Sequence, residues 1–277
     1  MTERGWSWDS TLYAGSAEFY PVGRVGYPPE LADRLADVLN LDGSGRLLDV
    51  GCGPGSLTLP MARHFAEAVG IDADPEMLAE AARQADRAGI TNVTWRHLRG
   101  EQLPAGIPAP SVVTFAQSFH WMDRDRVAAL VRQMLAEGGV VVHVGATTHE
   151  GIDTDEQLPH PRPPRAAIRT LIREFLGEAR RAGRSSLPNG ETAGGEDGIF
   201  RTAGFRGPEH LELPARTVRR TAEEVRASIY SLSSSTPHLF GPAFDAFDAR
   251  LRALLDQTSS GGVFSEHLRG ITVKIWR

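Results

Sequence analysis

The residues best suited to binding a ligand lie in one short run, Asp49 to Gly55, which reads Asp-Val-Gly-Cys-Gly-Pro-Gly. The glycines of this run, Gly51 and Gly53 among them, let the backbone bend sharply and let a ligand approach the main chain closely. A buried strand is predicted just before it, at Arg46–Val50, and a helix after it. The run therefore occupies the carboxyl end of a strand, where doubly wound sheets bind their ligands.

Two classes of cofactor compete for such a glycine turn. Dinucleotide-binding turns space their glycines G-x-G-x-x-G and hold a pyrophosphate at the helix N-terminus. Here the third glycine comes one residue early, at Gly55, and Ser56 follows it. Asp49 would repel a pyrophosphate but suits a cationic or zwitterionic ligand such as S-adenosylmethionine, which carries an ammonium group and a sulfonium centre. The turn favours S-adenosylmethionine, with an NAD(P)-dependent oxidoreductase as the alternative.

A second acidic residue, Asp72, ends the next predicted strand, 17 residues after Gly55. An acid at this place can accept hydrogen bonds from both ribose hydroxyls. Both cofactor classes use such an acid, so it indicates an adenosine ligand without choosing between them. Asp72 could instead cap the following helix, but Asp74, directly before Pro75, is the better candidate for that cap.

Strands and helices alternate over the first 145 residues, with strands predicted at 46–50, 68–72, 93–98, 111–116 and 140–144. This alternation predicts an α/β fold, a Rossmann-like doubly wound sheet that is mostly parallel. Alternating Ile271, Val273 and Ile275 predict a closing strand, which we expect to be antiparallel.

The pattern changes after Gly145. Helices are predicted at 166–182, 223–232 and 243–255, a strand at 211–218, and a glycine- and serine-rich loop at 183–198. These elements predict a helical cap inserted after strand five. The chain is thus divided into an N-terminal lid segment (1–28), a cofactor-binding core (29–146), an acceptor-binding cap with strand six (147–265) and the closing strand (266–277).

The N-terminal segment is unusually aromatic, with Trp6, Trp8, Tyr13, Phe19, Tyr20 and Tyr27. It is expected either to form a lid over a ligand or to pack on the core or on a neighbouring subunit, so a homo-oligomer is one possibility.

Composition excludes several other classes of protein. A net charge of −5 with mixed signs gives no electrostatic footprint for nucleic acid. The single cysteine, Cys52, cannot form an intrachain disulfide or a cysteine-rich zinc site, and we expect no metal centre. No signal-peptide core and no apolar run of membrane-spanning length is present, so a cytoplasmic protein is expected, without membrane or nucleic-acid partners.

Five runs, in chain order, resemble the successive motifs of the class I S-adenosylmethionine-dependent methyltransferases: LLDVGCGPGSLTLPMAR, GIDADPEML, GEQLP, AQSFHWMD and MLAEGGVVV. The chain is most similar to the small-molecule, type 11-like branch found in bacterial secondary metabolism. YPVGRVGYPPELADRLADVL resembles the N-terminal segment of that branch, and SIYSLSSSTPHLF and AFDAFDARLRALL resemble its late cap helices. The resemblance implies in-line methyl transfer to a small hydrophobic or aromatic metabolite, or a non-catalytic cofactor-binding protein of the same fold.

The resemblance also implies a set of cofactor-binding residues: Tyr20, Arg24, Asp49, Gly51, Cys52, Gly53, Gly55, Asp72, Ala73, Met77, Gly100, Glu101, Gln117 and Ser118. The glycine turn and the end of strand four would hold the methionine part, Asp72 the ribose, and the 100–101 loop the adenine. Tyr20 and Arg24 would close over the cofactor. The family often has an acid at position 99, where this chain has Arg99.

Methyl transfer needs a base only if the acceptor must lose a proton. His120 is the first catalytic candidate because it follows the fourth strand, where acceptor and cofactor should meet, and Tyr20 is the second. His120 could equally form part of a pocket wall. His149, His160 and His238 could line the acceptor pocket. Apolar side chains that could also line it are Phe175, Phe200, Ile229, Tyr230, Leu239, Phe240 and Phe244.

Overall fold

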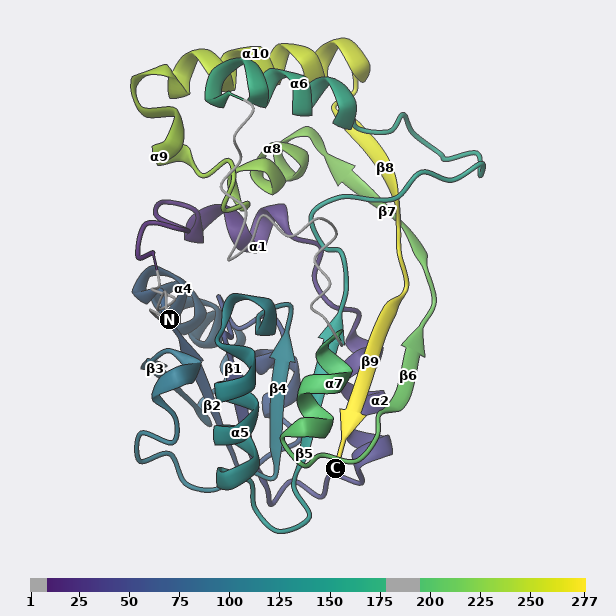
Figure 1. Ribbon diagram of the computed structural model, residues 1–277. Helices are drawn as coiled ribbons and strands as arrows, with labels where there is room; N and C mark the ends of the chain where they lie inside the picture. Colours follow the sequence, from purple (N-terminus) through teal and green to yellow (C-terminus); the bar gives the residue numbers. More distant parts are fainter. Residues whose placement is uncertain (1–8, 178–194) are drawn as a thin grey trace.

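The computed structural model describes residues 9–177 and 195–277 (Figure 1). Some predictions lie outside the described residues. They concern Trp6 and Trp8, the end of the helix predicted at 166–182 and most of the loop predicted at 183–198.

A seven-stranded sheet forms the core, with the spatial order β3-β2-β1-β4-β5-β9-β6. Its strands are β1 (Arg46–Val50), β2 (Glu67–Asp72), β3 (Val93–His97), β4 (Val112–Ala116), β5 (Val140–Gly145), β6 (Glu209–Leu213) and β9 (Ile271–Trp276). β9 runs antiparallel to both neighbours, and the other pairs are parallel. This confirms the predicted Rossmann-like sheet with its antiparallel last strand. The strand order reverses between β1 and β4, which places a ligand crevice at their carboxyl ends.

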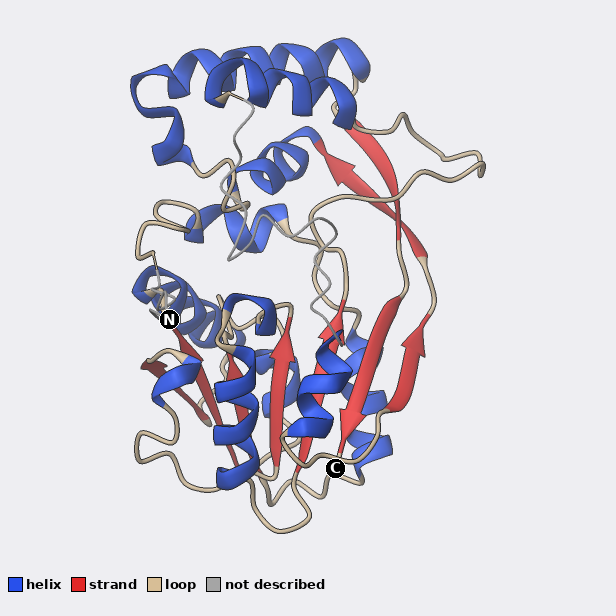
Figure 2. Ribbon diagram, in the orientation of Figure 1, coloured by secondary structure: helices blue, strands red, loops and turns tan. Residues whose placement is uncertain are grey.

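Helices cover both faces of the sheet (Figure 2). They are α2 (Pro29–Leu39), α3 (Thr58–Ala62), α4 (Pro75–Ala88), α5 (Arg124–Met134) and α7 (Gly195–Thr202). α2 and α3 bury Leu31, Leu35 and Met61 in one apolar cluster, whereas α5 and α7 bury Val127 and Phe200 in the cluster on the other face.

α7 begins inside the segment that the sequence predicts as loop. Its first turn is fixed by two contacts to the sheet, one between Glu196 and the His143 ring (3.2 Å) and an ion pair between Asp197 and Lys274 (2.6 Å). The helix thus depends on partners far away in the chain, which local composition does not show.

The cap is joined to the sheet by a two-stranded ribbon, β7 (Arg216–Thr221) with β8 (Val263–Leu268). Leu213 pairs with Ile271 in the core sheet and Arg216 pairs with Leu268 in the ribbon, so one antiparallel register continues across the break. The single strand predicted at 211–218 is therefore two strands, interrupted at Pro214, which cannot donate to a ladder. The domain boundary predicted at residue 265 falls inside β8.

The cap itself packs four helices over the ribbon and the N-terminal segment (Figure 1). These are α6 (Arg165–Leu176), α8 (Ala222–Tyr230), α9 (Pro237–Phe240) and α10 (Phe244–Thr258). They share an apolar core in which the Phe240 and Phe247 rings stack with their centroids 4.1 Å apart. Among the described residues, no helix is long and apolar enough to cross a membrane.

The N-terminal segment lies between cap and sheet. It contains a 3₁₀ turn, Ala17–Phe19, and the short helix α1, Tyr20–Gly23, which packs against α8. The carboxyl edge of the sheet is therefore covered by the described part of this segment.

Candidate cofactor-binding site

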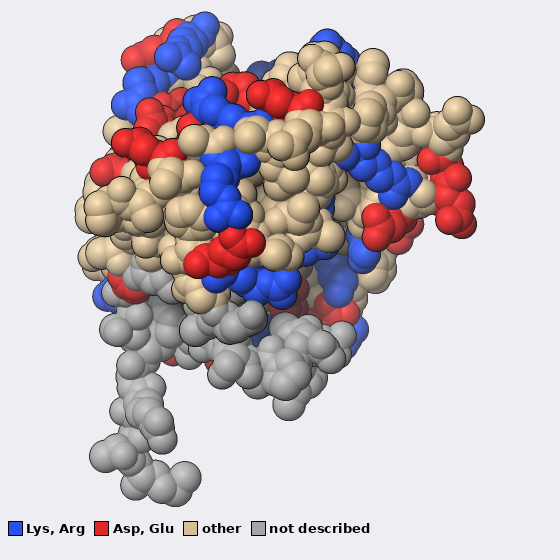
Figure 3. All heavy atoms as spheres, turned by 90° about the horizontal axis from the view of Figure 1, so that it is seen from above, with Lys and Arg blue, Asp and Glu red and all other residues tan. Residues whose placement is uncertain are grey.

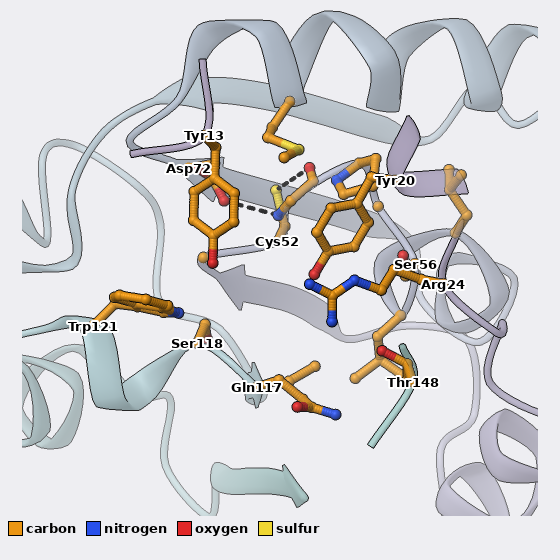
Figure 4. Close-up of a pocket in the computed structure, with 18 of the residues that line it drawn as sticks. Tyr13, Tyr20, Arg24, Cys52, Ser56, Asp72, Gln117, Ser118, Trp121 and Thr148 are labelled. Carbon is orange, nitrogen blue, oxygen red and sulfur yellow. Dashed lines mark hydrogen bonds between the residues drawn. The ribbon is translucent and has the colours of Figure 1, made fainter. Parts of the chain in front are cut away.

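A cavity of about 410 Å³ lies at the carboxyl ends of β1, β2 and β4 (Figure 4). Of the predicted site residues, all except Asp49 and His120 line it: Tyr20, Arg24, Gly51, Cys52, Gly53, Gly55, Asp72, Ala73, Met77, Gly100, Glu101, Gln117 and Ser118. The structure thus brings residues from five parts of the chain around one space, at the crevice where the strand order reverses.

The glycine turn forms the floor of the cavity. Gly51, Gly53 and Gly55 all have left-handed backbones, with φ of 70°, 53° and 81°. A Cβ atom at Gly51 would lie 2.5 Å from Cβ of Ser118, so both φ and space require glycine there. The turn is fixed to the next strand because the N–H of Gly53 donates to Oδ2 of Asp72 at 2.8 Å.

Asp72 ends β2 and faces the cavity with spare acceptor capacity. Each carboxylate oxygen accepts one backbone hydrogen bond, Oδ2 from Gly53 (2.8 Å) and Oδ1 from Asp74 (2.9 Å), and can accept a second. Burial raises the pKa of Asp72 to about 6, although the two backbone N–H groups oppose that shift. Asp74 caps α4, since its Oδ1 accepts from the N–H groups of Glu76 and Met77, and Asp72 is left for a ligand.

Asp49 occupies a different place from the one the sequence suggests. It is only 1% exposed, and its carboxylate accepts hydrogen bonds from the hydroxyls of Thr58 (2.6 Å) and Thr114 (2.7 Å). Burial raises its pKa, and the two threonine hydroxyls lower it. The side chain lies outside the cavity lining, where it ties β1 to β4 and to α3. The prediction that Asp49 contacts a ligand ammonium directly is therefore corrected: the Asp49 side chain supports the glycine turn.

His120 also lies outside the cavity lining. It belongs to a 3₁₀ turn, Phe119–Trp121, and its ring packs against that of Trp121 at a centroid distance of 4.9 Å. Trp121 lines the cavity in its place. The turn places the Trp121 ring in the cavity lining and leaves the His120 ring outside it, an arrangement that the sequence does not show.

The adenine-side loop offers one polar atom that lacks a partner. Oε1 of Glu101 accepts the N–H of Asp123 at 2.7 Å. Oε2 is buried and has no hydrogen-bond partner among the described residues, although Glu101 lines the cavity. A buried acceptor of this kind is costly unless a ligand satisfies it. Arg99 lines the same end.

Three tyrosines of the N-terminal segment, Tyr13, Tyr20 and Tyr27, line the opposite wall. Tyr13 meets Trp121 edge-on at 5.9 Å, and the Arg24 guanidinium lies 4.7 Å from the centre of the Tyr20 ring. Burial raises the pKa of Tyr13 and of Tyr27, so both are neutral hydrogen-bond donors at pH 7. Figure 4 shows Tyr13 and Tyr20 reaching into the cavity from one side, with Ser118, Gln117 and Trp121 across from them. Tyr13 was not among the predicted site residues; the aromatic density of the segment was its only signal.

Gln117 is held in a strained conformation at the end of β4. Its φ is 58°, a value uncommon outside glycine, and its side-chain amide donates to the carbonyl of Ala146. Such backbone strain gathers at binding and catalytic sites.

The remaining predicted pocket residues lie elsewhere. Phe200 packs with the Phe119 ring beside the sheet, in the cluster that α5 also joins. Five others belong to the cap core or pack against it: Phe175, Ile229, Tyr230, Phe240 and Phe244. His149 contacts Arg24, with its Nδ1 3.3 Å from the guanidinium. The apolar residues of the cap thus stabilise the cap, and the cavity wall is built by the N-terminal segment.

Comparison with known proteins agrees with this geometry. Residues 47–139 match the family model described as "Methyltransferase domain". An uncharacterized methyltransferase of Mycobacterium tuberculosis is 33% identical over 151 residues, which is 54% of this chain. The aligned part is 58% of that relative, so the chain spans less than two thirds of the length of the curated relatives named here.

Solved structures share the fold along most of the chain. A methyltransferase from Geobacter sulfurreducens, solved with S-adenosylhomocysteine, has a TM-score of 0.50 at 15% identity and covers 96% of this chain and 97% of its own. A precorrin decarboxylase from Methanobacterium thermoautotrophicum also reaches 0.50, at 14% identity, covering 92% and 93%.

The fold and the site together define an α/β protein with a Rossmann-like sheet and a cavity at the point where its strand order reverses. Residues 47–139 resemble a methyltransferase domain, which is the part of the chain that the family model matches. This match favours the methyltransferases over the dinucleotide-dependent oxidoreductases, the alternative that the glycine turn left open.

Proposed function

We propose that this protein transfers a methyl group from S-adenosylmethionine to a small hydrophobic or aromatic acceptor, in bacterial secondary metabolism. The observation that carries the proposal is the single cavity, which joins the glycine turn and Asp72 to an aromatic wall. S-adenosylmethionine supplies an electrophilic methyl carbon with a good leaving group, so the protein's work is positioning and exclusion of water.

The residues present fit this cofactor. Asp72 has two oxygens able to accept from ribose hydroxyls, and the orphaned Oε2 of Glu101 could accept from an adenine amino group. Gly53 lines the cavity with open space where a side chain would begin, which leaves room for the methionine part. Arg24 lines the same end and forms no ion pair with a carboxylate of the described residues, so it suits the cofactor carboxylate.

The acceptor would lie against Tyr13, Tyr20 and Trp121. Aromatic faces favour a flat or apolar molecule, and the hydroxyls of Tyr13 and Tyr20 could orient an oxygen or nitrogen on it. Tyr20 would then serve both ligands, as the second catalytic candidate.

The surface supports a small partner over a nucleic acid. On the face shown in Figure 3, which looks down on the cap, basic and acidic side chains are interspersed among the coloured residues. The coloured residues of that face form no continuous basic surface for a phosphate backbone.

Calorimetry and a transfer assay test the proposal. The wild-type protein is titrated with S-adenosylhomocysteine and with NADH, and is then incubated with methyl-labelled cofactor and a panel of phenols and aromatic amines. We expect binding of S-adenosylhomocysteine alone, and label in at least one aromatic acceptor. Binding of NADH would instead support the alternative function, an NAD(P)-dependent oxidoreductase. Cofactor binding without transfer to the panel or to a metabolite extract would leave a non-catalytic binding protein.

A further inference from the structure

The lid residues are attached to the cap. α1 lies directly beneath α8 in Figure 1, and Arg24 follows α1 in the chain. A Cβ atom at Gly23 would lie 2.3 Å from the backbone carbon of Ala227 in α8. The backbone of Gly23 is not left-handed, so this close approach alone is the reason for glycine.

The side chain of Arg24 is held by the same part of the cap. Its Nε donates to Oγ of Ser231 at 2.8 Å, and its Nη2 donates to the carbonyl of Ser231 at 2.9 Å. Its Nη1 lies 3.3 Å from Nδ1 of His149. Burial, together with the surrounding arginines, lowers the pKa of His149 to about 3, so the ring is neutral and can accept from Arg24.

Behind these contacts lies one buried carboxylate. Glu266 is 3% exposed and comes from β8 of the ribbon. Its two oxygens lie 3.0 and 2.9 Å from the guanidinium of Arg165, and Oε2 lies 3.3 Å from that of Arg220. Oε1 also accepts the N–H of Gly151 at 3.0 Å. One carboxylate therefore pairs with two guanidinium groups, the buried one of Arg220 and the largely buried one of Arg165.

Both arginines also donate hydrogen bonds that lead toward the lid. Arg220 donates to the carbonyl of Gly23 at 2.8 Å, at the end of α1. Arg165 donates to the carbonyl of His149 at 2.9 Å, and His149 contacts Arg24. One path from the carboxylate reaches the lid at Gly23 through Arg220. The other path reaches Arg24 through Arg165 and His149.

We propose that Glu266 is a positioning residue, which holds the lid over the methionine end of the cofactor. It acts through Arg165 and Arg220, and the residues it places are Tyr20 and Arg24. The inference rests on the proposed function, since a methionine end exists only if S-adenosylmethionine is the ligand.

The physical reason lies in the burial of the cluster. Removing the carboxylate leaves the buried guanidinium of Arg220 and the largely buried one of Arg165 without this counter-charge, and such groups move toward water or other acceptors. The carbonyl of Gly23 would then lose a fixed donor. Among the described residues, Asp72 and the glycine turn, which build the adenosine end of the cavity, make no hydrogen bond or ion pair with the cluster, so this end should not change.

Two ligands separate positioning from general destabilisation. S-adenosylhomocysteine has both the adenosine and the amino-acid part, whereas methylthioadenosine lacks the amino-acid part that the lid would hold. In Glu266→Gln we expect the Kd of S-adenosylhomocysteine to rise about ten-fold while that of methylthioadenosine changes less than about two-fold. Both are measured by calorimetry well below the melting temperature of the variant.

The control is Glu174→Gln, the same substitution in a half-exposed ion pair of the cap (Arg250, 2.6 Å), which should change neither Kd. If Glu266→Gln does not fold, Ser231→Ala takes its place, because it removes one hydrogen bond of Arg24 at a neutral site. Equal weakening of both ligands, or of neither, overturns the positioning role alone. If the wild-type protein binds neither ligand, the proposed function falls, and this inference with it.

Discussion

Cofactor affinity should depend on pH through Asp72. Burial raises the pKa of this carboxyl to about 6, and its ionised form is the better acceptor for ribose hydroxyls. The ionised fraction falls from roughly nine tenths at pH 7 to roughly one tenth at pH 5. Ligand binding favours the charged form, so affinity is complete above pH 7 and is lost as the pH falls through 6. We expect the Kd of S-adenosylhomocysteine to rise about ten-fold between pH 7 and pH 5, equivalent to about 1.4 kcal/mol.

Calorimetry from pH 5 to pH 8 measures this dependence, and two variants assign it. Asp72→Asn should bind weakly at every pH and lose the slope, because an amide has one acceptor oxygen and does not titrate here. His97→Gln is the matched control, since the His97 ring contacts the carbonyl of Ala73, 3.0 Å away on the adenine side. It should keep the slope. A flat profile in the wild type, or a slope that survives in Asp72→Asn, would refute the assignment of the ribose contact to Asp72.

Three further predictions concern the glycine turn and the role of His120 as a general base. Thr114→Val leaves the buried carboxylate of Asp49 with one hydrogen bond fewer, and should lower the free energy of unfolding by about 1–3 kcal/mol in urea denaturation. Gly51→Ala should abolish cofactor binding, because the new methyl group would lie 2.5 Å from a neighbouring side chain; Gly43→Ala, with similar φ but open space, should lose stability only. His120→Ala should keep near wild-type turnover at saturating acceptor, and a loss of two or more orders of magnitude would restore the base.

The cofactor side of the site was predictable because its signals are local. The glycine spacing, the strand before it and the acid at Asp72 lie within 27 residues, from Arg46 to Asp72. β1 has the predicted bounds, and the helix α4 begins at its predicted cap because Pro75 follows Asp74. Such elements are defined by their own residues and need no partner elsewhere in the chain.

The failures come from contacts between distant residues. β8 was missed because Ser265 and Glu266 are polar yet buried, which breaks the alternation that predicts a strand. Glu266 is buried because two arginines from other elements neutralise it. Asp49 was expected to face the ligand, but Thr114 on the neighbouring strand takes its carboxylate. No pattern along the chain shows these pairings.

The walls of the cavity could not be predicted for a related reason. Apolar residues of the cap, such as Phe240, were natural candidates for a pocket, but Phe240 stacks on Phe247 and belongs to the core that the small cap needs. The cavity wall is built instead by Tyr13 and Tyr20, on a segment that is itself held by the cap. Since Tyr20 faces the cofactor end and Tyr13 meets Trp121, a displacement of that one segment would change both ends of the cavity together. Under the proposed function, substitutions that disturb the contact between α1 and α8 should therefore alter the KM of the donor and that of the acceptor in the same variant.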